Sequence, residues 1–135
     1  MLGHNRRMSG AECLADMLKG YGVTHVFHVP AVLRRTFAEM ERRTKIKRIH
    51  THGEKSAAYM ADGYARACGR PGVCMAQVIG ALNLAAGLRD AWLAHSPVIA
   101  ITGECASHAS RRPAARLSAP ITCAMQMPGL PEARA

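Results

Sequence analysis

Short apolar segments rich in β-branched residues alternate with longer amphipathic segments along most of the chain. The apolar segments predict strands over residues 23–29, 46–51, 73–78 and 97–102. Helical spacing of apolar residues predicts helices that start after Ser9, near Leu33, near Gly53 and near Ala81. Ser9 and Glu12 match a capping box at the first of these starts. Because parallel strands need a long crossover connection, the alternation predicts an α/β fold, in which a mostly parallel sheet lies between two layers of helices.

The alternating pattern covers only the first part of the 135 residues. With 49% hydrophobic residues, the chain has enough apolar surface for one domain with a sizeable core. After Gly103 the sequence contains scattered arginines and prolines and has no sustained period. We therefore predict one domain over residues 1–103 and an irregular tail over residues 104–135, which is either non-native or disordered.

The chain is basic, with a formal net charge of +9. Much of this charge lies between Arg34 and Arg48, where acidic residues at helical spacing are typical of a solvated helix face. The chain has only two Phe, three Tyr and one Trp to stack on bases. The composition therefore favours a basic surface over nucleic-acid recognition, although a non-catalytic basic binding protein remains one alternative.

The cysteines and the apolar segments bear on the compartment. The five cysteines form no C-x-x-C pair, which is typical of free thiols in a reducing compartment. Residues 1–7 are followed by no apolar run, so a signal peptide is not predicted. The most apolar stretch, residues 73–88, is shorter than the roughly 20 residues that a membrane span needs. We therefore expect a cytoplasmic protein that does not enter a membrane.

Ligands of open parallel sheets bind beyond the carboxyl ends of the strands, so the loops there are the candidate sites. No G-x-G-x-x-G or phosphate-binding loop occurs in the chain. The loop after the second predicted strand contains His50, His52 and Glu54. By spacing alone, Thr51 and Glu54 match a helix capping box, which is the commoner role for such a glutamate.

The residues that follow Glu54 change this interpretation. The segment GEKSAAYMADGYAR, residues 53–66, closely resembles the HE-x-x-A-x-x-M-A-D-G-Y-A-R signature of thiamine-diphosphate enzymes of the acetolactate synthase type. Further matches follow in the order of the family: SGA (9–11), GVTHVF (22–27), PGV (71–73), GALN (80–83), GLRDA (87–91) and SPVIAITG (96–103). The resemblance covers about residues 8–103.

The resemblance implies a flavodoxin-like domain that binds the pyrimidine ring of thiamine diphosphate. It assigns cofactor binding to Pro30, Glu54, Gly80 and Asn83, and no metal ligand to this chain. The glutamate that matches Glu54 hydrogen-bonds the aminopyrimidine ring and activates the cofactor. The implied activity is that of a carboligase or decarboxylase acting on a 2-oxo acid, and some relatives also use FAD.

The family also implies parts that these residues lack. Its Mg²⁺ and diphosphate are held by a second domain with a G-D-G…N segment, which is absent from the 135 residues. We therefore expect a fragment that is inactive alone, or alternatively a subunit completed by a partner chain. The family pairs such domains, which implies a homodimer or a partner chain.

Two features of the sequence bear on that pairing and on the site. Alanines at positions 57, 58, 61 and 65 lie near one helix face, where they fit either close approach of a partner or tight packing on the sheet. His28 and Ala31 stand where relatives usually carry glycine, and Val78-Ile79 stands where many have Gly-Pro. These bulkier residues predict a reshaped pocket.

Overall fold

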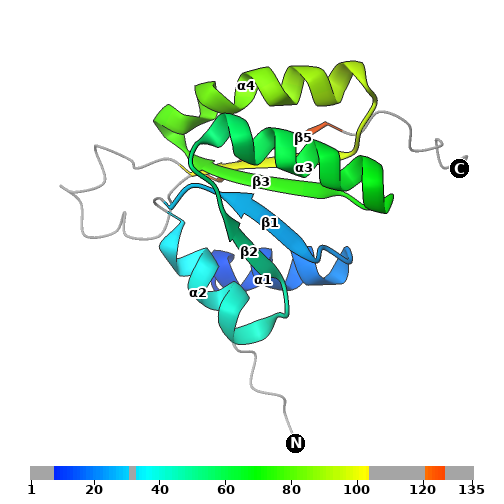
Figure 1. Ribbon diagram of the computed structural model, residues 1–135. Helices are drawn as coiled ribbons and strands as arrows, with labels where there is room; N and C mark the ends of the chain where they lie inside the picture. The colour runs from blue at the N-terminus through cyan, green and yellow to red at the C-terminus, as the bar shows by residue number, and fades with distance from the viewer. Residues whose placement is uncertain (1–7, 31–32, 104–120, 127–135) are drawn as a thin grey trace, which may run out of the picture.

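A computed structural model describes residues 8–30, 33–103 and 121–126 of the chain (Figure 1). Its strands are β1 (His25–His28), β2 (Lys47–His50), β3 (Gly72–Gln77), β4 (Val98–Gly103) and β5 (Ile121–Gln126). Its helices are α1 (Gly10–Gly20), α2 (Arg34–Arg43), α3 (Glu54–Cys68) and α4 (Val78–Leu93). The predicted alternation of helices and strands is confirmed over residues 10–103.

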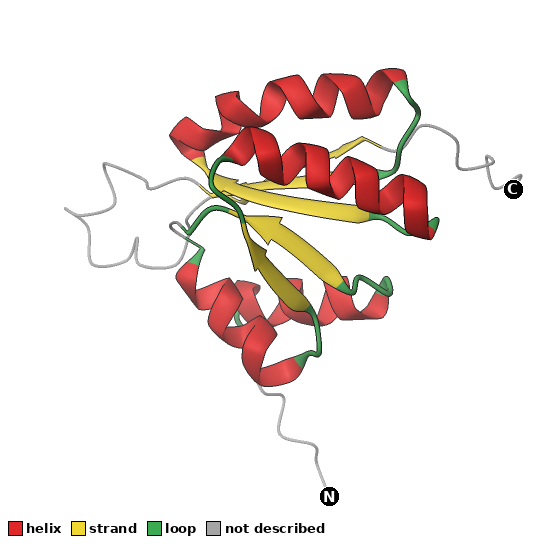
Figure 2. Cartoon of the chain, viewed as in Figure 1, coloured by secondary structure: helices red, strands yellow, loops and turns green. Residues whose placement is uncertain are grey.

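The strands form one sheet in the order β2-β1-β3-β4-β5. Strands β1 to β4 are parallel, and β5 pairs with β4 in the antiparallel sense. Helices α1 and α2 cover one face of the sheet, and α3 and α4 cover the other (Figure 2). The predicted α/β/α fold is therefore confirmed. Because the chain leaves β1 toward β2 and returns to β3 on the other side of β1, the order reverses between β1 and β3, where ligands of such sheets bind.

Larger aliphatic side chains fill the core beneath α1 and α2. Val26, Val73, Met75 and Ile101 point from the sheet toward Ala15, Leu18, Leu33 and Met40 of the helical layer. The capping box at the start of α1 is confirmed: the Glu12 amide donates to Ser9 Oγ (3.2 Å), and the Ser9 amide donates to the Glu12 carboxylate (2.9 Å). The capping box thus defines the start of α1, and side-chain packing holds the helical layer on the sheet.

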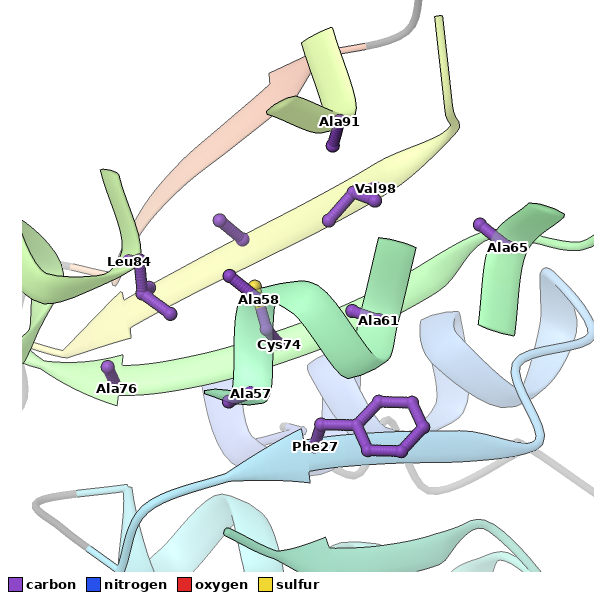
Figure 3. Close-up of a cluster of buried hydrophobic side chains, with 11 residues drawn as sticks. Phe27, Ala57, Ala58, Ala61, Ala65, Cys74, Ala76, Leu84, Ala91 and Val98 are labelled. Carbon is purple, nitrogen blue, oxygen red and sulfur yellow. The ribbon is translucent and has the colours of Figure 1, made fainter. Parts of the chain in front are cut away.

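Small side chains fill much of the core beneath α3 and α4 (Figure 3). The four alanines of α3 are buried there: Ala57, Ala58, Ala61 and Ala65. A Cβ added to Gly72 of β3 would lie 2.0 Å from the carbonyl oxygen of Ala61, and one added to Gly87 of α4 would lie 2.6 Å from the Cβ of Ala58. The alanine face therefore packs inside the domain against the sheet and α4, and it does not bind a partner.

The structure departs from the sequence predictions at several boundaries. Helix α4 begins at Val78 and not near Ala81, because Gln77 is its N-cap and the chain passes from β3 into the helix without a turn. The first predicted strand shortens to His25–His28. The prediction of an irregular tail is wrong over Ile121–Gln126, where an apolar segment adds β5 to the edge of the sheet. The remaining residues of the predicted tail lie outside the described part of the chain.

Three arginines of the basic cluster around α2 are paired with acidic side chains. Arg43 bonds Asp16 of α1, while Arg42 bonds Glu39. Arg48 donates to Glu41 at 3.0 Å. These pairs bear out the solvated helix face that the spacing indicated. None of the helices in the described ranges has both the length and the apolar character that crossing a membrane requires.

Candidate active site

Glu54 is the first residue of α3 and follows β2 after a short loop. The predicted capping box with Thr51 is wrong, because Gly53 is the N-cap and no side chain caps the helix. Thr51 holds the loop instead: its amide donates to the carbonyl of His28 (2.9 Å), and its hydroxyl donates to the carbonyl of Gly53 (3.0 Å). The buried Thr51 thus ties the start of α3 to the carboxyl end of β1, which fixes the position of Glu54.

The first turns of α4 supply the neighbours of Glu54. The side-chain amide of Asn83 donates to Oε2 of Glu54 at 3.2 Å. A Cβ added to Gly80 would lie 2.4 Å from Oε1 of the same carboxylate. The absence of a side chain at Gly80 therefore lets the Glu54 carboxylate pack against α4, and the amide of Asn83 orients it.

The structure brings Glu54, Gly80 and Asn83 together but leaves Pro30 apart from them. Pro30 is exposed after the end of β1 and lines a hollow on the α2 side of the sheet. Among the described residues, no hydrogen bond joins it to Glu54. Of the family departures, His28 faces α2, Ala31 lies outside the described residues, and the side chains of Val78 and Ile79 are not described.

The arrangement suits hydrogen bonding to a nitrogen heterocycle. Glu54 is half-buried, and Oε1 has no hydrogen-bond partner within the described part of the chain. An oxygen in this setting can accept a hydrogen bond from a protonated ring nitrogen. The residues around Glu54 therefore fit the pyrimidine ring that the resemblance implies.

The same residues do not fit a magnesium site. In the described ranges, no group of three or more His, Cys, Asp and Glu side chains is placed to hold a metal ion. Mg²⁺ prefers several oxygen ligands in a near-octahedral arrangement.

Other residues of the signature have structural roles that sequence inspection missed. Arg66 donates two hydrogen bonds to the buried carboxylate of Asp62 (2.9 and 2.7 Å). Burial raises the pKa of Asp62, but the hydrogen bonds and charge of Arg66, together with a contribution from Ser96, outweigh this effect, so the pKa lies below its usual value. The hydroxyl of Tyr64 bonds Thr24, next to β1. The i, i+4 spacing of Asp62 and Arg66 is a signal that could have revealed this ion pair.

The α/β/α sheet and the glutamate at its carboxyl edge define a ligand-binding domain of the doubly wound class. Comparison with known proteins identifies the family: residues 8–125 match the N-terminal TPP binding domain of thiamine pyrophosphate enzymes. The chain belongs to this family. The matched region extends past Gly103 and includes most of β5.

Acetolactate synthases are among the similar curated proteins. The chain is 40% identical over 104 residues to acetolactate synthase of Arthrospira platensis, covering 73% of this chain and 18% of that protein. It is 39% identical over 98 residues to the probable acetolactate synthase large subunit of Methanocaldococcus jannaschii, covering 72% and 17%. For acetolactate synthase 2 of Nicotiana tabacum the identity is 39% over 97 residues, covering 70% and 15%. The chain thus spans less than a fifth of the length of these relatives.

Proposed function

We propose that this chain supplies the pyrimidine side of a thiamine-diphosphate site in an acetolactate synthase-like enzyme that acts on 2-oxo acids. The observation that carries the proposal is the contact of the Glu54 carboxylate with Asn83 and Gly80. The cofactor, when bound, supplies an electron sink for making or breaking a bond between carbons. The use of FAD and a cytoplasmic location stay predictions.

Each residue of the cluster has a separate task in this proposal. Glu54 hydrogen-bonds a pyrimidine ring nitrogen through Oε1 and exchanges a proton with it. Asn83 holds the other oxygen, so the carboxylate keeps one orientation. Gly80 leaves room for the carboxylate and the ring to lie close to the helix backbone. A carboxylate that is already oriented needs little reorganisation when a proton moves.

In this proposal the diphosphate and Mg²⁺ are bound by a segment outside these 135 residues, on the same polypeptide or on a partner chain. The outer face of α3 and α4 supports the presence of a second subunit. Large apolar side chains are exposed there: Tyr59, Met60, Leu82, Trp92 and Leu93. Leu82 is 80% exposed and lies next to Asn83. A subunit that covered Leu82 would therefore also exclude water from the carboxylate of Glu54.

The test is a titration of the full chain with thiamine and, separately, with thiamine diphosphate plus Mg²⁺. Binding is measured by calorimetry and by the shifts of backbone amide signals in NMR spectra. We expect weak binding of both ligands with similar affinity, because the chain contacts only the pyrimidine ring. Glu54→Gln should abolish binding of both ligands. Gly80→Ala should do so as well, because the added Cβ displaces the carboxylate.

Two results would contradict the proposal. The first is Mg²⁺-dependent binding of thiamine diphosphate at least about a hundredfold tighter than that of thiamine, which corresponds to about 2.7 kcal/mol and would mean that this chain holds the diphosphate. The second is unchanged thiamine binding by Glu54→Gln. Glu39→Gln is the matched control, since Glu39 lies on α2 and bonds Arg42, away from the cluster.

A further inference from the structure

The hollow beside Pro30 lies on the face of the sheet opposite to α3 and α4, between α2 and the edge strand β2. Its volume is about 520 Å³, and it opens to solvent. It is lined by His28, Pro30, Arg34, Phe37, Ala38, Glu41, Arg48 and His50. We refer to it as the α2–β2 groove. Its position at the carboxyl ends of β1 and β2 is one where open sheets bind ligands.

The strand periodicity places the polar side chains of this groove. Alternate residues of a strand face opposite sides of a sheet, so Arg48 and His50 of β2 face α2, whereas Ile49 packs toward α3. His28 of β1 is the register partner of His50. The two imidazole rings stack with centroids 5.7 Å apart and planes 11° from parallel. Two imidazoles therefore lie side by side in the groove.

The charges of the groove leave one cation available to a ligand. Arg48 donates to the carboxylate of Glu41 (3.0 Å) and to the carbonyl of Phe37 (3.4 Å), so these groups occupy it. Arg34 forms no ion pair with any described residue. It stands at the start of α2, whose N-cap, Leu33, offers no side-chain hydrogen bond to the first turn. The helix dipole thus adds to the attraction of an anion by Arg34.

An apolar wall faces these donors. The ring of Phe37 lies 4.3 Å from the ring of His28, centroid to centroid, and Ala38 and Pro30 extend the wall. Nδ1 of His28 is buried and has no hydrogen-bond partner in the described part of the chain. An unsatisfied buried atom costs free energy, which a polar partner in the groove would recover.

We propose that the α2–β2 groove binds a small organic carboxylate, with Arg34 and His50 donating to the carboxylate and Phe37 contacting its apolar part. The planar guanidinium matches a carboxylate in two parallel hydrogen bonds. An apolar wall opposite the donors suits an organic acid better than phosphate, which exposes oxygen on every side. The groove is separate from the Glu54 cluster, so the proposal does not depend on the cofactor role of that cluster.

The experiment is a titration of the full chain with sodium benzoate, in which binding is measured from the imidazole ¹⁵N–¹H shifts of the histidines. Benzamide, which has the same ring but no charge, is the ligand control, and inorganic phosphate is the alternative anion. We expect benzoate to shift His28 and His50 with a saturable curve, and benzamide and phosphate to bind at least about tenfold more weakly, or about 1.4 kcal/mol. Thiamine should leave these two shifts unchanged.

Variants of neighbouring arginines complete the test. Arg34→Gln should weaken benzoate binding at least about tenfold, or about 1.4 kcal/mol. Arg35→Gln removes the same charge from the next residue of α2, which does not line the groove, and should change the affinity by less than about twofold, or 0.4 kcal/mol. Equal losses in the two variants, equal binding of benzoate and benzamide, or tighter binding of phosphate would each overturn the proposal. The circular dichroism spectra of both variants should match that of the parent chain.

Discussion

The two helical layers of this domain differ in the surface that they present to water. The α1–α2 layer carries ion pairs across its outer side, such as those of Arg43 with Asp16 and Arg48 with Glu41. The α3–α4 layer exposes more large apolar side chains, among them Leu82 and Trp92, than the α1–α2 layer, where Met17 and Tyr21 are exposed. A helix that is apolar on all sides is normally buried on all sides. The comparison agrees with a solvent surface on the first layer and supports our proposal that another subunit covers the second.

The two layers also differ in how they contact the sheet. Leucine, methionine and isoleucine side chains lie between the sheet and the α1–α2 layer. The α3–α4 layer approaches through alanine and glycine, so that backbone meets backbone, as at Gly72 and Ala61. Side chains can change rotamer to accept an added methyl group, whereas backbone cannot move without shifting the helix. The α3–α4 layer should therefore tolerate substitution of its small residues poorly.

Gly72→Ala is the substitution from which we expect the largest effect. The new Cβ would lie 2.0 Å from the carbonyl oxygen of Ala61, so α3 would have to move away from β3. We expect the free energy of unfolding to fall by about 3 kcal/mol or more, measured by urea denaturation of the full chain.

Gly63→Ala is the matched control for this change. Gly63 lies on the exposed side of the same helix, and a Cβ there would have no heavy atom within 4 Å. Alanine has the higher helix propensity, so this variant should gain about 0.5–1 kcal/mol in stability. Similar stability of the two variants would show that α3 does not approach the sheet as closely as described.

Leu82→Lys tests the proposed subunit surface. We expect the parent chain to form a dimer in sedimentation equilibrium. The variant should dissociate at a concentration on the order of tenfold higher or more, because burying a leucine contributes about 1.5–3 kcal/mol. Leu82 is 80% exposed in the isolated chain, so the stability of the monomer should not change.

Met17→Lys provides the comparison from the other layer. Met17 is 49% exposed on α1, and lysine there should leave the association unchanged. A parent chain that stays monomeric at all concentrations, or a Met17→Lys variant that dissociates as readily as Leu82→Lys, would contradict the assignment of the subunit surface to the α3–α4 layer.

The sequence was most informative where local rules determine the structure. The alternation of apolar and amphipathic segments predicted the parallel strands, and Ser9 with Glu12 predicted the start of α1, because period and capping depend on residues close in the chain. Thr51 and Glu54 show the limit of such rules. Their spacing fits a capping box. In the structure, however, the amide of Thr51 donates to the carbonyl of His28 in β1, and Gly53 takes the N-cap position of α3. That bond depends on strand pairing, which spacing does not encode.

The candidate site shows the same limit. The resemblance selected Glu54, Gly80 and Asn83, but only the packing of α3 against α4 shows that one carboxylate contacts both of the others. The alanines of α3 fitted two interpretations, and the decision required knowing which side of the helix faces the sheet. The α2–β2 groove was not predicted at all, because its donors come from β1, β2 and α2 and have no common spacing in the sequence.

The smallest effect that we predict concerns the α2–β2 groove, where His28 is the titrating group. Burial, and to a lesser extent the charges of His50 and Arg48, lower the pKa of His28 below its ordinary value of 6.5. The unfolded chain therefore takes up this proton at a higher pH than the folded chain. The corresponding stability is present above about pH 6.5 and is lost as the pH falls through the lowered pKa of the folded state.

His28→Gln should flatten this part of the pH dependence. The urea-determined free energy of unfolding, measured between pH 7.5 and 5, should fall less steeply in the variant than in the parent chain, by at most about 1.4 kcal/mol per pH unit. His52→Gln is the control, because His52 is exposed in the loop before α3 and should leave the slope unchanged. Arg34, Arg48, Glu41 and His50 also line the groove. The charges of the arginines are constant over this range. An unaltered slope in His28→Gln would show that His28 is as accessible to protons as a surface histidine.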